Sequence, residues 1–145
     1  RNWWLEMGKK KYPLTTKVLI TADGGGSNSS RSRLWKRELQ KLSNELKIEI
    51  HVCHFPPGTS KWNKIEHRMF SHITKNWRAR PLVSLEVIVN LIANTKTSKG
   101  LVIKAKADEN QYEKGIKITD KEFKEINIVN SNFKGNWNYK IIPKM

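Results

Sequence analysis

Apolar and polar positions follow two different periods in the first half of the chain. Residues 17–22 form a short apolar run, rich in β-branched side chains, that ends at Asp23 and three glycines. Such a run is typical of a buried strand in a mixed sheet. Residues 29–46 instead place apolar side chains at helical spacing, about 100° per residue, with Ser30 or Ser32 as the N-cap. The apolar arc of this predicted helix consists of Leu34, Trp35, Leu39, Leu42 and Leu46.

A second strand and two further helices follow. Residues 48–55 alternate between apolar and polar side chains, and a pair of prolines ends the run. Helical spacing then predicts helices at residues 61–77 and 84–94, with Ser84 as the N-cap of the later one. In that later helix we expect four side chains to face inward, namely Leu85, Ile88, Val89 and Ile92.

The two ends of the chain are less regular. Residues 1–16 show neither period, so we expect a leader or loop that continues a missing upstream part. A strand–helix–strand unit with two apolar strands predicts an α/β layered domain. Near the C-terminus the pattern predicts strands at 101–107 and 115–119, a short helix at 120–126 and a last strand at 137–142.

Charge is the first indication of function. The 145 residues suffice for one compact domain, and 37% hydrophobic with 28% charged residues indicates a folded chain. Lys and Arg number 28 against 13 Asp and Glu, giving a net charge of +15. A surface this positive favours a polyanionic partner such as nucleic acid. The alternative is a merely basic, soluble protein without such a partner.

The remaining composition excludes several classes. Cys53 is the single cysteine, so the chain has no internal disulfide and nothing indicates secretion. The longest mostly apolar stretch, residues 82–93, is too short to span a bilayer, and we expect no membrane partner. Arg1 is not a start methionine, so we expect the chain to be part of a longer protein.

Asp23 is the first candidate for chemistry. It stands where a predicted strand ends, and ligands of α/β sheets collect outside the carboxyl ends of strands. The structural alternative is an Asp that closes an Asx-turn. The glycines that follow Asp23 do not form a phosphate loop, because no Gly-Lys-Ser or Gly-Lys-Thr follows and position 29 is Ser.

Glu66 is the second candidate. On a helical projection it shares a face with several apolar side chains, so burial without a partner would carry a large desolvation cost. We therefore expect it to face a basic residue or a metal, with Asn63 one turn earlier to orient it. The alternative is a glutamate that leans toward solvent. The apolar side chains of this face are Trp62, Ile65, Met69, Phe70, Ile73 and Trp77.

Two carboxylates, one after a strand and one on a later helix, suit a two-metal site for phosphoryl transfer. Such a site needs at least three acids, and none of Glu6, Asp108 or Asp120 is well placed in the sequence. A zinc site is not supported, because the alternating His51, Cys53 and His54 have no second ligand pair. Basic side chains around Glu66 are candidates for contact with a DNA backbone: Lys61, Lys64, His67 and Arg68.

Two long segments resemble a known family. Residues 18–28 read VLITADGGGSN, and residues 53–70 read CHFPPGTSKWNKIEHRMF. Both are similar to the Rhodopirellula-type transposase DDE domain, a group of bacterial insertion-sequence transposases, and the likeness continues through residues 76–83 and 135–139. The second segment also resembles the proline-rich turn and Asn-x-Ile-Glu pattern of the wider mariner-like superfamily.

The resemblance implies an RNase H-like mixed sheet flanked by helices. It implies that Asp23 is the second catalytic Asp and Glu66 the catalytic Glu, that both bind metal, and that Asn63 supports Glu66. The implied cofactor is Mg²⁺ or Mn²⁺ in a two-metal site. The implied activity is DNA cleavage at transposon ends followed by strand transfer, in a bacterial cytoplasmic protein that associates with the nucleoid and forms multimers on DNA.

The chain departs from the family in lacking an acid for the first catalytic position. We therefore expect the C-terminal portion of a transposase, N-terminally truncated, with a small β-rich C-terminal extension. The expected parts are a leader at 1–16, the catalytic domain at 17–98 and the extension at 99–145. The alternative function is a catalytically inactive, basic DNA-binding remnant. A nuclease for RNA–DNA hybrids is disfavoured by the segment from Pro56 to Glu66.

Overall fold

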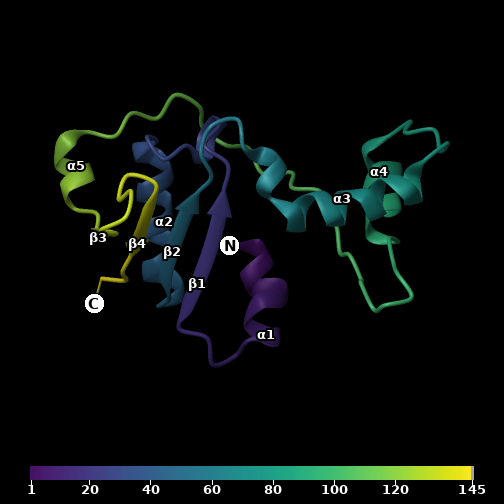
Figure 1. Ribbon diagram of the computed structural model, residues 1–145, viewed down its shortest axis with the longest axis horizontal. Coiled ribbons are helices and arrows are strands. Elements are labelled where there is room, and N and C mark those ends of the chain that lie inside the picture. Colours follow the sequence, from purple (N-terminus) through teal and green to yellow (C-terminus); the bar gives the residue numbers. More distant parts are fainter. Residues whose placement is uncertain (145) are drawn as a thin grey trace. The chain divides into compact units, whose positions relative to one another are not determined.

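The computed structural model describes residues 1–144, and its contacts divide the chain into two compact units (Figure 1). Unit 1 contains Arg1–Ser60 together with the chain from Gly115 onward, and unit 2 contains Lys61–Lys114. The predicted α/β class is confirmed. Unit 2 is inserted between two parts of unit 1, which the sequence pattern did not indicate.

A four-stranded mixed sheet forms the centre of unit 1, in the order β1-β2-β4-β3. Strands β1 (Lys17–Ala22) and β2 (Glu49–His54) are parallel and confirm the first two predicted strands. Strand β4 (Asn138–Ile141) runs antiparallel to β2 on one side and to β3 (Ile128–Asn130) on the other. The C-terminal strands therefore complete the same sheet as β1 and β2.

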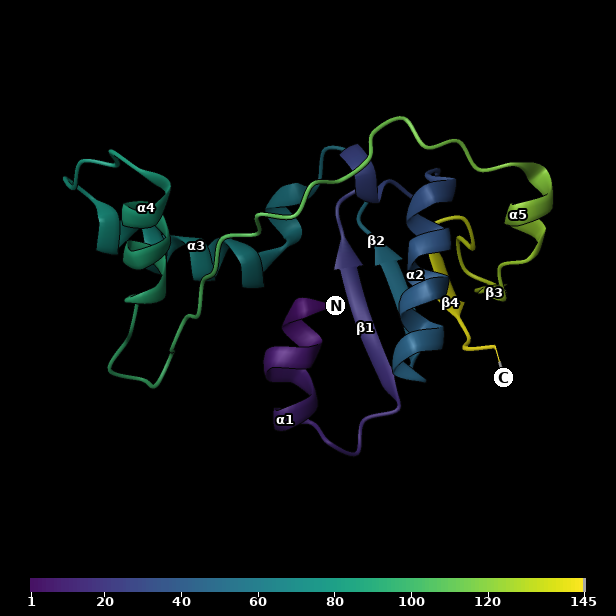
Figure 2. The same ribbon diagram turned by 180° about the vertical axis from the view of Figure 1, so that it is seen from behind.

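Helix α2 (Arg33–Leu46) packs on one face of this sheet, as Figure 2 shows. Its predicted N-cap is confirmed at Ser32, whose hydroxyl accepts a hydrogen bond from Trp35 N. The core consists of apolar side chains from the helix and from one face of β2 and β4. The buried members of this core, to which Ile126 between α5 and β3 also belongs, are Leu39, Ile50, Val52, Ile126, Tyr139 and Ile141.

Gln40 joins this helix to the C-terminal segment. The side chain is buried, and its Nε2 donates to the carbonyl of Ile142 at 2.9 Å. Its Oε1 accepts from the backbone N–H of Asn127 at 2.7 Å. One amide thus satisfies two backbone groups that the sheet leaves unpaired, and it ties residues 115–144 to α2.

The ends of the chain differ from the predictions. The expected loop at residues 1–16 contains a π-helical turn, η1 (Trp4–Gly8), that continues into α1 (Lys9–Lys11). The strands predicted at 101–107 and 115–119 are absent from the described chain, apart from one bridge between Lys96 and Val102. Their apolar positions alternate as in a strand, but no neighbouring strand pairs with them.

The short C-terminal helix is confirmed as α5 (Asp120–Lys124). Thr119 and Glu122 form a capping box, in which the Thr119 hydroxyl accepts from Glu122 N and the Glu122 carboxylate accepts from Thr119 N. Arg33 of α2 pairs with Asp120 at 2.6 Å. The cap and the ion pair fix where α5 begins and attach it to α2.

Unit 2 consists of two helices and a long irregular segment. The short turn η3 (Ser60–Trp62) precedes α3 (Lys64–Trp77), and α4 (Leu85–Ala93) begins at the predicted cap Ser84. Asn76 donates to the carbonyl of Leu91 and joins the two helices. The inward orientation predicted for Leu85 is wrong, because this side chain is 63% exposed at the first position of α4. Within the described residues, no helix is long and apolar enough to cross a bilayer.

Candidate functional site

Asp23 follows the last residue of β1, at the edge where the two parallel strands end. The carbonyl of the preceding Ala22 accepts a hydrogen bond from Phe55 N at 2.7 Å, so the chain ends of β1 and β2 are fixed side by side. Asp23 itself is exposed. Its Oδ1 lies 3.4 Å from Asn28 Nδ2, a long contact. Among the described residues no backbone N–H donates to this carboxylate, so Asp23 does not close an Asx-turn.

Glu66 lies in the first turn of α3 and is exposed. Asn63, the N-cap residue of the helix, donates from Nδ2 to Glu66 Oε2 at 2.6 Å. The side chain of Asn63 forms no capping bond to the helix backbone. The amide of Asn63 therefore orients the carboxylate instead of capping α3, in the geometry expected for a supporting residue.

Glu66 is exposed to solvent rather than buried among the apolar side chains of its helical face. Its apolar face is largely exposed, with Trp62 at 54%, Ile65 at 83% and Phe70 at 47%, and only Ile73 is buried. The helical spacing gave the correct set of side chains on one face, but spacing does not determine what covers that face. The carboxylate stands in solvent beside exposed apolar groups, and its neighbour is an amide rather than a basic residue.

The donor chemistry of Asp23 and Glu66 fits a hard divalent cation, because both offer exposed carboxylate oxygens. Each unit supplies one of the two acids. Asp120 is already paired with Arg33, and Asp108 accepts from Tyr112 and Asn110. Within residues 1–144, no group of three or more His, Cys, Asp or Glu side chains could hold a metal ion.

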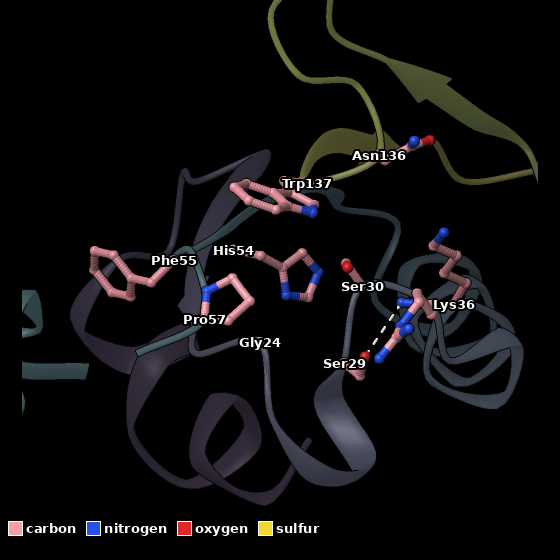
Figure 3. Close-up of a pocket in the computed structure, with 10 residues that line it drawn as sticks. Gly24, Ser29, Ser30, Lys36, His54, Phe55, Pro57, Asn136 and Trp137 are labelled. Atoms are coloured by element: carbon pink, nitrogen blue, oxygen red, sulfur yellow. Dashed lines mark hydrogen bonds between the residues drawn. The ribbon is translucent and has the colours of Figure 1, made fainter. Parts of the chain in front are cut away.

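A pocket of about 550 Å³ opens in unit 1, next to the segment that follows Asp23 (Figure 3). We call it the His54 pocket, because the His54 ring lies at its centre, with Pro57 on one side and Ser30 on the other. The polar groups that line it come from His54, Ser29, Ser30, Arg31, Lys36 and Asn136. Gly24, Phe55, Pro57 and Trp137 complete the wall, and none of the lining residues is acidic.

His54 is buried at the end of β2, with 6% of its surface exposed. Its Nε2 lies 3.0 Å from the hydroxyl of Tyr139, which also accepts from Trp35 Nε1 at 3.0 Å. Burial lowers the pKa of His54, and the nearby Lys36 ammonium lowers it further, while the Asp23 backbone partly offsets both. Burial likewise raises the pKa of Tyr139 to about 12. Both rings are therefore uncharged near neutral pH.

The four basic candidates around Glu66 are all exposed. Lys61 lies in η3, and Lys64, His67 and Arg68 lie in the first half of α3. Their positions on one short segment suit contact with a polyanion, but their role in DNA binding stays a prediction.

The sequence pattern did not single out the His54 pocket. His54 was considered only as a zinc ligand, although it alternates with Ile50 and Val52 and so belongs to the buried face of β2. A histidine on a buried strand face, two residues before a proline pair, was the available signal. Lys36 gave no comparable signal, because it stands among many basic residues of α2.

Of three comparisons with known proteins, one finds a match. No curated protein and no solved structure matches the chain. The family model of the Rhodopirellula transposase DDE domain matches residues 1–143. That match includes both candidate acids, Asp23 and Glu66. Membership of a transposase family implies DNA as a partner. The chain belongs to the Rhodopirellula transposase DDE domain family.

Proposed function

We propose that the chain is the part of a DNA transposase that supplies two acids for metal-dependent strand cleavage and strand transfer. The observation that carries this proposal is the pair of exposed carboxylates, Asp23 at the end of a strand and Glu66 oriented by Asn63, in a member of a DDE family. The net charge of +15 supports DNA as the substrate.

In this proposal Asp23 and Glu66 hold Mg²⁺ or Mn²⁺, which supplies charge stabilisation for the attacking and leaving oxygens of a phosphodiester. Asp23 provides a carboxylate on a rigid strand end. Glu66 provides a second carboxylate whose rotamer is restrained by the 2.6 Å bond from Asn63. Basic side chains of α3, including Lys64 and Arg68, hold the DNA backbone.

A third acid is required, and the RNase H-like architecture proposed here has a position for it. Strand β1 is the first strand in the order β1-β2-β4-β3, so one of its edges has no partner among the described strands. A further strand pairing with that edge would place its own carboxyl end close to Asp23 if it ran parallel to β1. We propose that the first catalytic Asp comes from such a strand.

The test uses the complete product of the gene that encodes this chain, with DNA that carries the flanking ends of the element. We expect cleavage that depends on Mg²⁺ or Mn²⁺. Asp23→Asn and Glu66→Gln should each lower the rate at least about 100-fold, since a lost metal ligand removes several kcal/mol of transition-state stabilisation. Glu86→Gln is the matched control, because Glu86 is also exposed in the first turn of a helix, α4.

Wild-type rates in both Asp23→Asn and Glu66→Gln would contradict the assignment. The second candidate is a basic, catalytically inactive DNA-binding remnant, favoured by the presence of only two suitable acids in the described chain. It predicts duplex binding that weakens steeply with salt, shows little sequence preference and is accompanied by no cleavage with either metal.

A further inference from the structure

The His54 pocket contains a buried ring nitrogen that no protein group meets in good hydrogen-bond geometry. Within the described residues, His54 Nδ1 is buried and has no hydrogen-bond partner of normal geometry, although the Asp23 backbone is near enough to influence its pKa. Buried polar atoms without partners are rare in folded proteins. Such an atom, at the wall of a pocket of about 550 Å³, is available to a better-placed partner from outside the chain.

The hydrogen-bond chain behind His54 defines which nitrogen carries the proton. Trp35 Nε1 can only donate, so the Tyr139 hydroxyl oxygen accepts from it. The buried Tyr139 proton then needs an acceptor, and His54 Nε2 lies 3.0 Å away. Because the neutral ring has one protonated nitrogen, Nε2 accepts and Nδ1 carries the hydrogen. The unsatisfied atom is therefore an N–H donor.

The other polar groups of the pocket are suited to the same kind of ligand. The Lys36 ammonium is partly buried and pairs with no carboxylate of the described chain, since its contacts are with the rings of Phe123 and Tyr139. Burial lowers the pKa of Lys36, and a bound anion would offset that cost. Arg31 and the hydroxyls of Ser29 and Ser30 add further donors at the start of α2.

We propose that the His54 pocket binds a phosphate group of the DNA backbone, next to Asp23. A tetrahedral anion can accept from several directions, and the pocket offers an N–H, an ammonium, a guanidinium and two hydroxyls without any carboxylate. The assignment of the phosphate to DNA rests on the proposed function. Phosphate recognition itself rests only on the pocket.

The first experiment measures binding of a labelled DNA duplex by fluorescence anisotropy, in metal-free buffer over a series of NaCl concentrations. Lys36→Met should weaken binding and reduce the slope of log affinity against log salt by about one, the value for one lost phosphate contact. Lys124→Met is the matched control, because Lys124 is an exposed lysine of unit 1 that does not line the pocket.

The second pair of variants tests the histidine. His54→Gln retains an acceptor for Tyr139 but has no donor at the Nδ1 position, whereas His54→Asn keeps an N–H near that position. We expect about 10-fold weaker duplex binding for His54→Gln than for His54→Asn, the effect of one hydrogen bond to a charged group. If circular dichroism shows that either variant is unfolded, the comparison of Lys36→Met with Lys124→Met decides the proposal.

A separate titration with inorganic phosphate, followed by ¹⁵N NMR of the imidazole, distinguishes the sources of the phosphate. A shift of His54 Nδ1 with duplex supports the proposal. A shift with inorganic phosphate, combined with duplex binding that is indifferent to Lys36→Met, would overturn the assignment to DNA. Equal effects of Lys36→Met and Lys124→Met on duplex affinity, without any shift of the His54 Nδ1 resonance, would overturn the proposal that the pocket binds phosphate. A wild-type chain that binds no duplex even at low salt would instead contradict the proposed function.

Discussion

Helices α2 and α3 are both 14 residues long, and both have an apolar stripe at helical spacing. The stripe of α2 packs on the sheet of unit 1, where Leu39 is 4% exposed. The stripe of α3 is mostly open, and Ile65 is 83% exposed. The two helices show that amphipathic spacing predicts where a helix forms, while burial requires a second surface. Experiments that compare matched residues of the two helices can sharpen or contradict this distinction.

The largest difference is expected between Leu39→Ala and Ile65→Ala. Leu39 belongs to the buried core, so its truncation should lower the free energy of unfolding by about 2–5 kcal/mol. Ile65 is exposed, and Ile65→Ala should change the free energy of unfolding by about 0.5 kcal/mol or less. Urea unfolding followed by far-UV circular dichroism measures both. A comparable loss in Ile65→Ala would show that the α3 stripe is packed in the folded protein.

The next comparison concerns the amides that join each helix to its neighbour. Gln40→Leu leaves the N–H of Asn127 and the carbonyl of Ile142 without their partner at two partly buried hydrogen bonds. We expect a loss of about 1–3 kcal/mol in the free energy of unfolding. Asn76→Leu removes one hydrogen bond between α3 and α4, where Gln40→Leu removes two to the C-terminal segment, so its cost should be smaller.

Hydrogen exchange of the C-terminal strands provides the control for Gln40. Faster exchange of β4 amides in Gln40→Leu, with α3 unchanged, is the expected pattern. Equal exchange in both segments would mean that Gln40 does not anchor the C-terminal strands to α2.

The local pattern predicted most of the secondary structure because each element has its own signal. Ser32 and Ser84 were available as caps. β1 has an apolar run that glycines follow, and β2 has an alternating pattern that prolines follow. The strands predicted at 101–107 and 115–119 failed for a different reason. An alternating pattern describes one strand, whereas a strand forms only where another strand pairs with it.

The candidate site was predictable only in part. Asp23 and Glu66 were found from their positions and from the family resemblance, and the bond from Asn63 to Glu66 has the predicted geometry. The pocket around His54 depends on contacts between β2 and β4, which are 85 residues apart at the His54–Tyr139 bond. No local period carries such information, so the pattern could indicate a histidine on the buried face of β2 but not the pocket around it.

The pH dependence of stability offers a smaller effect that is specific to unit 1. Burial lowers the pKa of His54 from its usual value of 6.5, so below pH 6.5 the unfolded chain binds a proton that the folded chain does not. Stability should therefore fall as the pH drops below 6.5, by no more than about 1.4 kcal/mol per pH unit for one proton.

His54→Gln should flatten this pH dependence, and His72→Gln in α3 is the matched control. The readout is the urea midpoint as a function of pH, so a general loss of stability in either variant does not disturb the comparison. If the urea midpoint of His54→Gln still falls with decreasing pH as in the wild type, another titrating group causes the effect.

The smallest effect on stability distinguishes the two N-cap positions. The Ser32 hydroxyl caps α2, so Ser32→Ala should cost about 1 kcal/mol. Asn63 at the start of α3 forms no capping bond, and Asn63→Ala should leave stability nearly unchanged. Asn63→Ala should instead release the Glu66 carboxylate from its hydrogen bond. We expect metal-dependent cleavage to fall by about 10- to 100-fold, because a group that orients a metal ligand is removed.

A change in the metal dependence distinguishes this positioning role from a structural one. If Asn63 acts through Glu66, then Asn63→Ala should raise the Mn²⁺ concentration that gives half-maximal cleavage, and saturating Mn²⁺ should recover much of the rate. Ser32→Ala should leave the metal dependence unchanged although it destabilises α2. The opposite result, a stability loss in Asn63→Ala with unchanged metal dependence, would make Asn63 a helix cap like Ser32 and would remove the distinction between the two helix starts.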